Sequence, residues 1–416
     1  MLGSFFSPLL MLAAASSRPL RVLLAIDKFK DSLDAAGVAR AVALGLEQSQ
    51  LASSVSQLSI DIVCMSDGGE GFLHALEQPL ALCLRSVRVT GPLGSPLDAS
   101  YGIAHGADGK LAVIEMARAS GLELVPPAQR NPLLTTSRGT GELVADAIAQ
   151  GCSRILLGVG GSATSDGGLG ALGALGLSVT CEADERDERQ PAVIFGRHVA
   201  AVRELHLARW PLLPPQVQQL DIACDVSNPF VGALGAVRVF AAQKGATPEM
   251  QEALEAGMVR LAALVHQHTG VAIADLPGAG AAGGIAGSFH ALLGASLVRG
   301  IRLIAEAHRL EERIRDADLV ITGEGSYDAQ TAGGKVVAHV LELALQHAAT
   351  RPMALVVVCG RAADDIPHQP QVDVVPLLSR FPIEYSMQHT AEALTEITRQ
   401  VIAPIVAKRL AISTTE

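Results

Sequence analysis

Aromatic side chains are scarce in this chain of 416 residues, since Phe, Trp and Tyr together make up only 3% of it. Proteins that bind single-stranded nucleic acid stack bases on aromatic rings, so this scarcity argues against that class. Basic residues are also outnumbered, because 32 Lys and Arg stand against 42 Asp and Glu and give a net charge of −10. This sign disfavours binding to a phosphate backbone or to an anionic membrane surface.

Paired cysteines, long apolar runs and several catalytic motifs are absent as well. The six cysteines include no Cys-x-x-Cys pair, which argues against a zinc site or a disulfide framework and fits a reducing compartment. No stretch of roughly eighteen apolar residues is present, so no transmembrane helix is expected. The P-loop strings GxxxxGKS and GxxxxGKT, the GxSxG elbow and HExxH are missing, which excludes those enzyme classes. We expect a cytoplasmic protein without nucleic-acid or membrane partners.

The first twenty residues combine an apolar run with small residues, but no Lys or Arg precedes that run. Three interpretations stay open for this extension: a disordered tail, an organelle-targeting segment and a secretion signal. Residues 1–20 are therefore left out of the fold.

Short apolar runs rich in Val, Ile and Leu recur along the remaining chain with helical stretches between them. This pattern is typical of strands buried in a largely parallel sheet, so the fold class is α/β. We predict strands at 21–26, 60–65, 111–117, 154–159, 221–226, 318–323 and 355–360. We predict helices at 35–47, 142–150, 169–175, 249–269, 288–310, 334–346 and 391–409. The charged and proline-rich segment 181–215 indicates a surface excursion.

The most informative motif is the glycine-rich run GVGGSATSDGGLGALG, which begins at Gly158 and follows a predicted strand. It offers flexible backbone N–H donors, three hydroxyls and a carboxylate where a helix begins, and helix N-termini attract anions. The run predicts a phosphate or anion site, with a tight structural turn as the alternative. The candidate residues are Gly160, Gly161, Ser162, Thr164 and Asp166.

Acidic and basic residues follow several other predicted strands. Asp27 and Lys30 stand in AIDKFKDSL, and Asp67 stands in MSDGGEG beside two adjacent glycines. Carboxylates at such a turn suit a hydrated magnesium ion, because magnesium takes oxygen ligands and keeps several waters. Solvated surface turns are the alternative for both motifs.

Three further motifs carry the remaining candidates. Arg138 in TSRGTGE precedes a helix start, and its guanidinium suits a carboxylate or a phosphate. Asp225 and Lys244 belong to the region CDVSNPFVG…QKGA. TGEGSYDAQTAGGK supplies the charges that a magnesium-bound nucleotide requires, namely two carboxylates and a lysine: Glu324, Asp328 and Lys335.

PGAGAAGG contains the string GxGxxG through Gly278, Gly280 and Gly283, which is associated with dinucleotide binding. Pro277 stands where the fingerprint requires a strand, so the match is weak. A nucleotide-dependent oxidoreductase of small hydroxy acids, using NAD, stays open as an alternative function.

Taken together, the motifs resemble the bacterial-type glycerate kinase family, and they occur in the same order. They include IDKFKDSL, MSDGGEG, TTSRGTGEL, GVGGSATSDGGLGALG, ACDVSNPFVG, QKGA, LPGAGAAGG and LVITGEGSYDAQT. The resemblance implies phosphorylation of D-glycerate by ATP with Mg²⁺, at the 2-hydroxyl. One departure concerns the TGEG motif, which normally continues with arginine and here continues with Ser326. Lys28, Arg361 or another nearby cation is a candidate replacement.

The resemblance also implies two α/β domains. A Rossmann-like or flavodoxin-like domain would comprise residues 21–90 and 295–416, and a second α/β domain, residues 91–294, would be inserted into it. The active site is expected in the cleft between them. The oligomeric state stays open, a homo-oligomer included.

We hypothesise the following roles. Asp166 is the first choice for the base on the glycerate hydroxyl and Asp225 the second, while Lys244 and Lys335 bind phosphates. Glu324 and Asp67 are candidate magnesium ligands, and Lys30 or Arg138 pairs with the glycerate carboxylate. Asp27 completes the substrate set, and Asp328 joins Gly160, Gly161, Ser162 and Thr164 in the cofactor set. A non-catalytic protein that binds glycerate or another anion is a second alternative.

Overall fold

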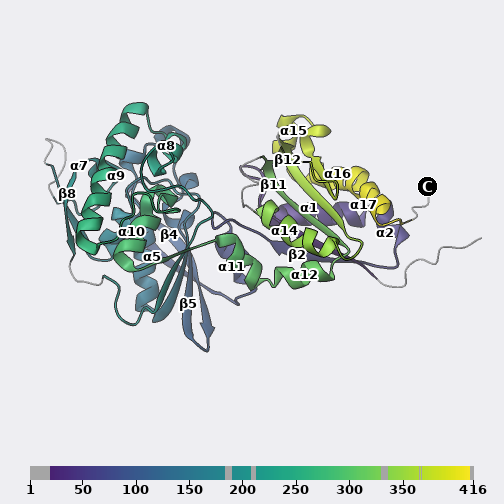
Figure 1. Cartoon of the computed structure of the whole chain (residues 1–416), viewed down its shortest axis with the longest axis horizontal. Coiled ribbons are helices and arrows are strands. Elements are labelled where there is room, and N and C mark those ends of the chain that lie inside the picture. The colour runs from purple at the N-terminus through teal and green to yellow at the C-terminus, as the bar shows by residue number, and fades with distance from the viewer. Residues whose placement is uncertain are drawn as a thin grey trace, which may run out of the picture. The chain divides into compact units, whose positions relative to one another are not determined.

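The computed structural model describes residues 19–182, 190–207, 212–328, 336–364, 366 and 368–412. The chain divides into two compact units, and each contains its own sheet (Figure 1). Unit 1 combines Met1–Cys64 with Leu310–Glu416, and unit 2 is Met65–Arg309. The N-terminal extension, as far as residue 18, lies outside the described residues, and so does Lys335.

Unit 1 is built on a parallel five-stranded sheet in the order β13-β12-β11-β1-β2. Its strands are β1 (Leu20–Ile26), β2 (Leu58–Cys64), β11 (Leu319–Tyr327), β12 (Ala354–Ala362) and β13 (Val372–Pro376). Numbered within the unit, the order is 2-1-3-4-5, which is that of flavodoxin-like sheets. In such sheets ligands bind at the carboxyl ends where the order reverses, which here means the ends of β1 and β11.

Helices cover both faces of this sheet because its strands are apolar on both sides. Residues of α1 (Ala35–Glu47), α16 (Thr390–Ile397) and α17 (Ala403–Arg409) share one core with β1, β11 and β12. The α14 helix (Val336–Ala348) packs on β11 and β12. Asp34 begins α1 by accepting a hydrogen bond from the Gly37 amide at 2.6 Å. Shorter helices complete the unit: α2 (Gln50–Ser54), α12 (Leu310–Asp316), α15 (Ile383–Gln388), the 3₁₀ turn Leu377–Ser379 and the π-helical turn Thr398–Ile402.

Unit 2 contains a mixed six-stranded sheet in the order β10-β9-β6-β5-β4-β3. Its strands are β3 (Cys83–Thr90), β4 (Pro96–Gly106), β5 (Gly109–Glu115), β6 (Cys152–Gly158), β9 (Gln219–Ala223) and β10 (Ser296–Val298). The β3-β4 and β4-β5 pairs are antiparallel and the other pairs are parallel. A separate antiparallel pair joins β7 (Leu177–Cys181) to β8 (Val202–Leu207).

The helices of unit 2 bury one continuous apolar core against this sheet, with members such as Leu143, Leu157, Leu261 and Phe289. They are α3 (Phe72–Glu77), α4 (Ala117–Ser120), α5 (Arg138–Ala149), α6 (Leu169–Ala174), α7 (Gly196–Ala201), α8 (Ala236–Phe240), α9 (Pro248–Thr269), α10 (Ile285–Leu293) and α11 (Gly300–Ala307). Short 3₁₀ turns occur at Leu122–Leu124, Pro127–Gln129, Pro132–Leu134, Ala242–Lys244 and Ala281–Gly284. Within the described part of the chain, no helix is long and apolar enough to cross a membrane.

The α/β fold class is confirmed, and the seven predicted strands and most predicted helices are present. The single helix predicted over 288–310 is wrong, because Gly294 takes a left-handed conformation (φ 70°) and ends α10 before β10 and α11 follow. The segment 181–215 contains α7 and β8 rather than only an excursion. The antiparallel strands β3 and β4 were not predicted.

The boundaries of the two units differ from those expected at residues 90 and 295. Strand β3 pairs with β4, and β10 pairs with β9. Both β3 and β10 therefore belong to the sheet of unit 2. The unit boundaries therefore fall at 64/65 and 309/310.

Close packing of α5 on α6 generates a stability prediction. A Cβ at Gly141 would lie well under 3.0 Å from the Ala171 carbonyl oxygen. Because this contact is with backbone, the two helices would have to move apart to accommodate the added methyl group. Gly141→Ala should lower the free energy of unfolding by about 2 kcal/mol or more. Urea denaturation followed by circular dichroism measures the loss. Gly106→Ala is the matched control, because a Cβ there would meet no atom closer than 3.6 Å. Equal midpoints for the two variants would contradict the expected collision.

Candidate active site

In unit 1, the structure brings the turn after β1 against the end of β11. The Asp27 amide donates to the Gly323 carbonyl at 3.0 Å, and the Lys28 amide donates to the Asp27 carboxylate at 2.7 Å. The backbone of Lys30 lies so near Gly325 that a Cβ on the glycine would be 3.2 Å from the Lys30 amide nitrogen. The predicted motifs AIDKFKDSL and TGEGSYD therefore meet where the strand order reverses, and Lys30 is exposed there.

Glu324 and Ser326 extend β11 at this edge and are paired in register with Cys359 and Arg361 of β12. Glu324 is buried, and its charge adds to burial in raising the pKa of Cys359 to about 12. Ser326 accepts a hydrogen bond from Arg361 Nε at 2.9 Å. Asp328, half-buried, follows the strand directly.

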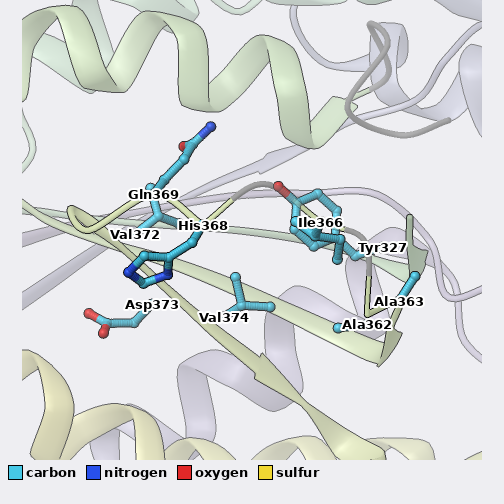
Figure 2. Close-up of a pocket in the computed structure, with 9 residues that line it drawn as sticks. All are labelled: Tyr327, Ala362, Ala363, Ile366, His368, Gln369, Val372, Asp373 and Val374. Atoms are coloured by element: carbon cyan, nitrogen blue, oxygen red, sulfur yellow. The ribbon is translucent and has the colours of Figure 1, made fainter. Parts of the chain in front are cut away.

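A cavity of about 380 Å³ lies beside the ends of β11 and β12 in unit 1 (Figure 2). Tyr327 and Ala362 line it from the two strands, and His368 and Gln369 line it from the connection to β13. Its size is in the range of small-molecule sites. No motif predicted this cavity, because the connection that closes it carries no recognisable pattern.

In unit 2, three predicted motifs meet at the carboxyl ends of β6 and β9. The Gly160 amide donates to the Gly68 carbonyl at 3.1 Å, and the Val159 amide donates to the Ala223 carbonyl at 3.3 Å. A Cβ on Gly160 would collide with Gly69, so the two turns require glycine at their closest approach. MSDGGEG, GVGGSATSDGG and CDVSN thus form one cluster.

Asp225 is a buried acid in this cluster. Its Oδ2 accepts a hydrogen bond from the Ile301 amide at 3.0 Å. Its Oδ1 lies 3.5 Å from Arg299 Nε and has no hydrogen-bond partner of good geometry among the described residues. Burial raises the pKa of Asp225 to about 7, and the charge of Asp67 adds to the rise, against the Ile301 amide and Arg299. A carboxyl group that titrates near neutrality is suited to proton transfer.

Lys244 is also buried, below the glycine-rich turn. Its Nζ donates to Ser162 Oγ at 2.9 Å and to the Thr164 carbonyl at 2.6 Å. Burial lowers its pKa to about 8, against the opposing effect of the Asp166 charge. Lys244 therefore fixes the turn and places a positive charge beneath it.

Asp166, our first choice for the base, has a different geometry from the one that role requires. A base must touch the substrate hydroxyl, whereas this carboxylate is fully buried. Its Oδ2 accepts from the Ser137 amide, the Ser137 hydroxyl and the Gly170 amide, and its Oδ1 accepts from the Gly168 amide. Burial raises the pKa of Asp166, and these hydrogen bonds oppose the rise. Both oxygens of Asp166 are thus occupied by protein donors, whereas Asp225, which is also buried, keeps Oδ1 without a hydrogen bond of good geometry among the described residues.

Other predicted residues of the glycine-rich turn divide between surface and interior. Gly161 is exposed, with φ 73°, while the Gly160 amide is taken by Gly68. Thr164 is fully buried, and Ser162 is bound by Lys244. The side chains of the turn therefore do not form a phosphate site along its whole length. The phosphate role of Gly160 and Gly161 stays a prediction.

Arg138 has a protein partner rather than an open guanidinium. Its Nε donates to Glu142 Oε1 at 2.9 Å, and Glu142 also accepts from the Thr90 amide at 2.6 Å. Sequence reasoning missed Ser137, its neighbour, whose hydroxyl anchors Asp166. The available signal was the position of this serine directly before a helix, where a hydroxyl is commonly a cap.

The GxGxxG string is a packing motif in this fold. A Cβ on Gly280 would collide with the Pro229 carbonyl oxygen, and a Cβ on Gly283 would collide with that of Thr164. Ala282, Gly283 and Gly284 take successive left-handed conformations and form no strand-to-helix turn. This arrangement removes the sequence argument for the oxidoreductase alternative.

The two proposed magnesium ligands belong to different units, Glu324 to unit 1 and Asp67 to unit 2. Among the described residues, no three or more Asp, Glu, His or Cys side chains are grouped to hold a metal. The predicted cleft between two domains likewise stays a prediction.

Known proteins resemble this chain over nearly its whole length. A sequence model of the glycerate kinase family matches residues 22–406. The chain is 39% identical to the glycerate 2-kinase of Escherichia coli K12, over 86% of this chain and 90% of that protein. It is 38% identical to a glycerate kinase of Haemophilus influenzae, over 92% of this chain and 96% of that protein. A crystal structure named for glycerate kinase 2 from Salmonella typhimurium LT2 superposes with a TM-score of 0.72 at 36% identity, covering 94% and 100% of the two chains. The resemblance read from the motifs is confirmed.

The hydrogen bonds of Asp166 predict that its role is structural. In Asp166→Asn an amide NH₂ would face backbone N–H donors, so at least one buried donor would lose its acceptor. The variant should lose about 3 kcal/mol of unfolding free energy, measured by urea denaturation. Asp98→Asn, at an exposed pair with Arg88, is the control and should change stability by about 0.5 kcal/mol or less. A native-like midpoint for Asp166→Asn would show that the buried cluster contributes little.

The raised pKa of Asp225 predicts a pH-dependent stability difference. The folded protein holds this proton up to about pH 7, whereas the unfolded chain releases it near pH 4. Stability from this group is therefore full below pH 4 and is lost as pH rises to 7, by up to about 1.4 kcal/mol per pH unit. Asp225→Asn should gain stability relative to the unchanged protein between pH 5 and pH 8 in thermal melts. A constant difference across that range would contradict the shift.

Proposed function

The chain belongs to the glycerate kinase family, and we propose that it transfers the terminal phosphoryl group of ATP to the 2-hydroxyl of D-glycerate with magnesium. The observation that carries the site assignment is Asp225, a buried acid with a pKa of about 7 beside glycine-rich turns. Phosphoryl transfer to an alcohol needs little covalent chemistry from the protein. It needs positioned charges for the phosphates and a group that accepts the hydroxyl proton.

Asp225 is the proposed base. The attacking hydroxyl has to lose its proton as the new O–P bond forms, and a carboxylate titrating near neutrality accepts it efficiently. Oδ1 is the proposed contact atom: Oδ2 accepts from the Ile301 amide, whereas Oδ1 is buried and has no hydrogen bond of good geometry among the described residues. Arg299 Nε, 3.5 Å from Oδ1, keeps the carboxylate oriented and favours its ionised form.

Lys244 supports the proposed phosphate site by holding the glycine-rich turn. Its ammonium donates to Ser162, which directly follows the exposed Gly161, and to the Thr164 carbonyl. A buried charge is weakly screened, so it acts on this end of the turn. In this proposal Lys244 orders the turn and attracts the phosphates without being their main hydrogen-bond donor.

Magnesium suits the carboxylates of Asp67 and Glu324, since this ion takes oxygen ligands and keeps most of its waters. One or two carboxylates therefore suffice when the remaining ligands are nucleotide oxygens and water. When bound, the ion neutralises charge on the phosphates. Lys30, exposed at the turn after β1, is the proposed partner of the glycerate carboxylate, with Asp27 shaping the turn.

A protein that binds glycerate without turnover is the remaining alternative. A coupled assay with ATP, Mg²⁺ and D-glycerate separates the two, and phosphorus NMR of the product distinguishes 2-phosphoglycerate from 3-phosphoglycerate. We expect turnover and 2-phosphoglycerate. Binding of glycerate without ATP consumption would refute the kinase proposal for this chain.

Asp225→Asn tests the proposed base. The variant should keep its KM for ATP while kcat falls by roughly 100-fold or more, because general-base catalysis typically contributes that much. In the unchanged enzyme kcat/KM should rise with pH and level off above about pH 7, since the carboxylate must be ionised. Asp221→Asn, at an acid within β9, the strand that ends two residues before Asp225, is the control. Retention of the pH profile in Asp225→Asn would assign the base elsewhere.

A further inference from the structure

Arg361 places a fixed guanidinium at the carboxyl end of β12. Its Nε donates to Ser326 Oγ at 2.9 Å, across a register pair of β11 and β12. The side chain is exposed, and among the described residues no carboxylate pairs with it. Because the hydrogen bond uses Nε, the two terminal amino groups keep their donors for a planar anionic group.

Several other arginines of unit 1 pair with acids, although Arg380 donates to the neutral Gln400. Arg313 pairs with Asp61, Arg409 pairs with Asp373, and Arg399 pairs with Glu396. Arg361 differs from these three because a neutral hydroxyl orients it and no acid among the described residues compensates its charge. An oriented but unneutralised guanidinium is the arrangement that binds a carboxylate or phosphate in two-pronged fashion.

The register places this charge beside Glu324. Side chains alternate along a strand, so Glu324 and Ser326 share one face of β11, and their partners Cys359 and Arg361 share the same face of β12. Residues two apart on one face are separated by about 7 Å. An acid and an arginine at this spacing match the two charges of a metal-bound nucleotide.

The neighbouring cavity favours a nucleotide over glycerate as the ligand of Arg361. Its lining includes Tyr327 and Ala362, which follow Ser326 and Arg361 and by the same alternation face the other side of the sheet, and it continues past the end of β12 to Ala363 and Ile366 (Figure 2). At about 380 Å³ it has room for a nucleobase or a ribose, whereas a three-carbon acid would fill little of it. The phosphates of a nucleotide seated there would reach Arg361 around the carboxyl ends of the strands, since β12 ends at Ala362.

We propose that Arg361, oriented by Ser326, binds the phosphate chain of the nucleotide substrate. This inference rests on the proposed kinase function. It also gives the departure at Ser326 a structural meaning: the guanidinium expected after TGEG enters from the adjacent strand, and the serine in its place holds it. Arg361 contacts the substrate, and Ser326 is a positioning residue.

Three variants and a swap test the proposal. Arg361→Ala should lower kcat/KM for ATP by roughly 10- to 100-fold, as expected for loss of a charged hydrogen-bond pair, with KM for D-glycerate within twofold. Arg361→Lys should recover little of this, because an ammonium lacks the planar fork. Ser326→Ala should cost less than Arg361→Ala. The double variant Ser326→Arg/Arg361→Ala should recover most of the lost activity, because adjacent strands lie only about 4.8 Å apart.

Calorimetric titration with ATP alone separates this inference from the kinase proposal. Arg361→Ala should weaken ATP binding by roughly 10-fold or more even if glycerate is not the acceptor. Arg313→Ala, an arginine of α12 paired with Asp61, is the control and should leave both binding and turnover unchanged. The proposal would be overturned if Arg361→Ala kept ATP binding and turnover within twofold of normal, or if it changed KM for glycerate instead. It would also be overturned if the double variant recovered no activity, or if the unchanged protein bound no ATP.

Discussion

A buried carboxylate, Asp166, holds the centre of unit 2 together. Both of its oxygens accept hydrogen bonds, and the donors come from two separate chain segments, at Ser137 and at Gly168 and Gly170. Burying a charge is costly unless its hydrogen-bonding capacity is filled, so this cluster admits one arrangement of the start of α5 and the start of α6. Lys244 adds a second buried charge nearby and attaches the preceding part of the glycine-rich turn through Ser162 and Thr164. The turn thereby presents a defined surface at Gly160 and Gly161.

This buried framework is the reason for proposing Asp225 rather than Asp166 as the base. Both acids have raised pKa values because of burial, but both oxygens of Asp166 accept hydrogen bonds from the protein. Asp225 keeps one oxygen without a well-formed hydrogen bond and stands near a second acid, Asp67. The contrast shows that a shifted pKa identifies a functional acid only when the geometry leaves an atom for the substrate. In unit 1 the same reasoning separates Arg361, whose terminal donors are open, from arginines already paired with acids.

The sequence predicted the fold class because buried parallel strands are continuous apolar runs, as in β1 and β12, and these runs stand out from their flanks. It failed for β3 and β4, whose alternating and partly exposed residues produce no such run. It failed at 288–310 because the helical pattern continued through Gly294, which ends α10. The candidate residues were found as motifs, yet their roles depended on which way each side chain points. Thr164 and Asp166 face inward, and the pairing of Ser326 with Arg361 requires a strand register that no motif contains.

The discontinuity of unit 1 has a consequence for the newly made chain. The β1 strand lies between β2 and β11, and the 254 residues 65–318 separate the end of β2 from the start of β11. At translation rates of about 5 to 20 residues per second, the ribosome needs roughly 13 to 50 seconds to supply that partner. During this interval unit 2 is being synthesised, and the apolar edge of β1 has no neighbour on one side. The sheet of unit 1 can therefore be completed only after the whole of unit 2 has been synthesised.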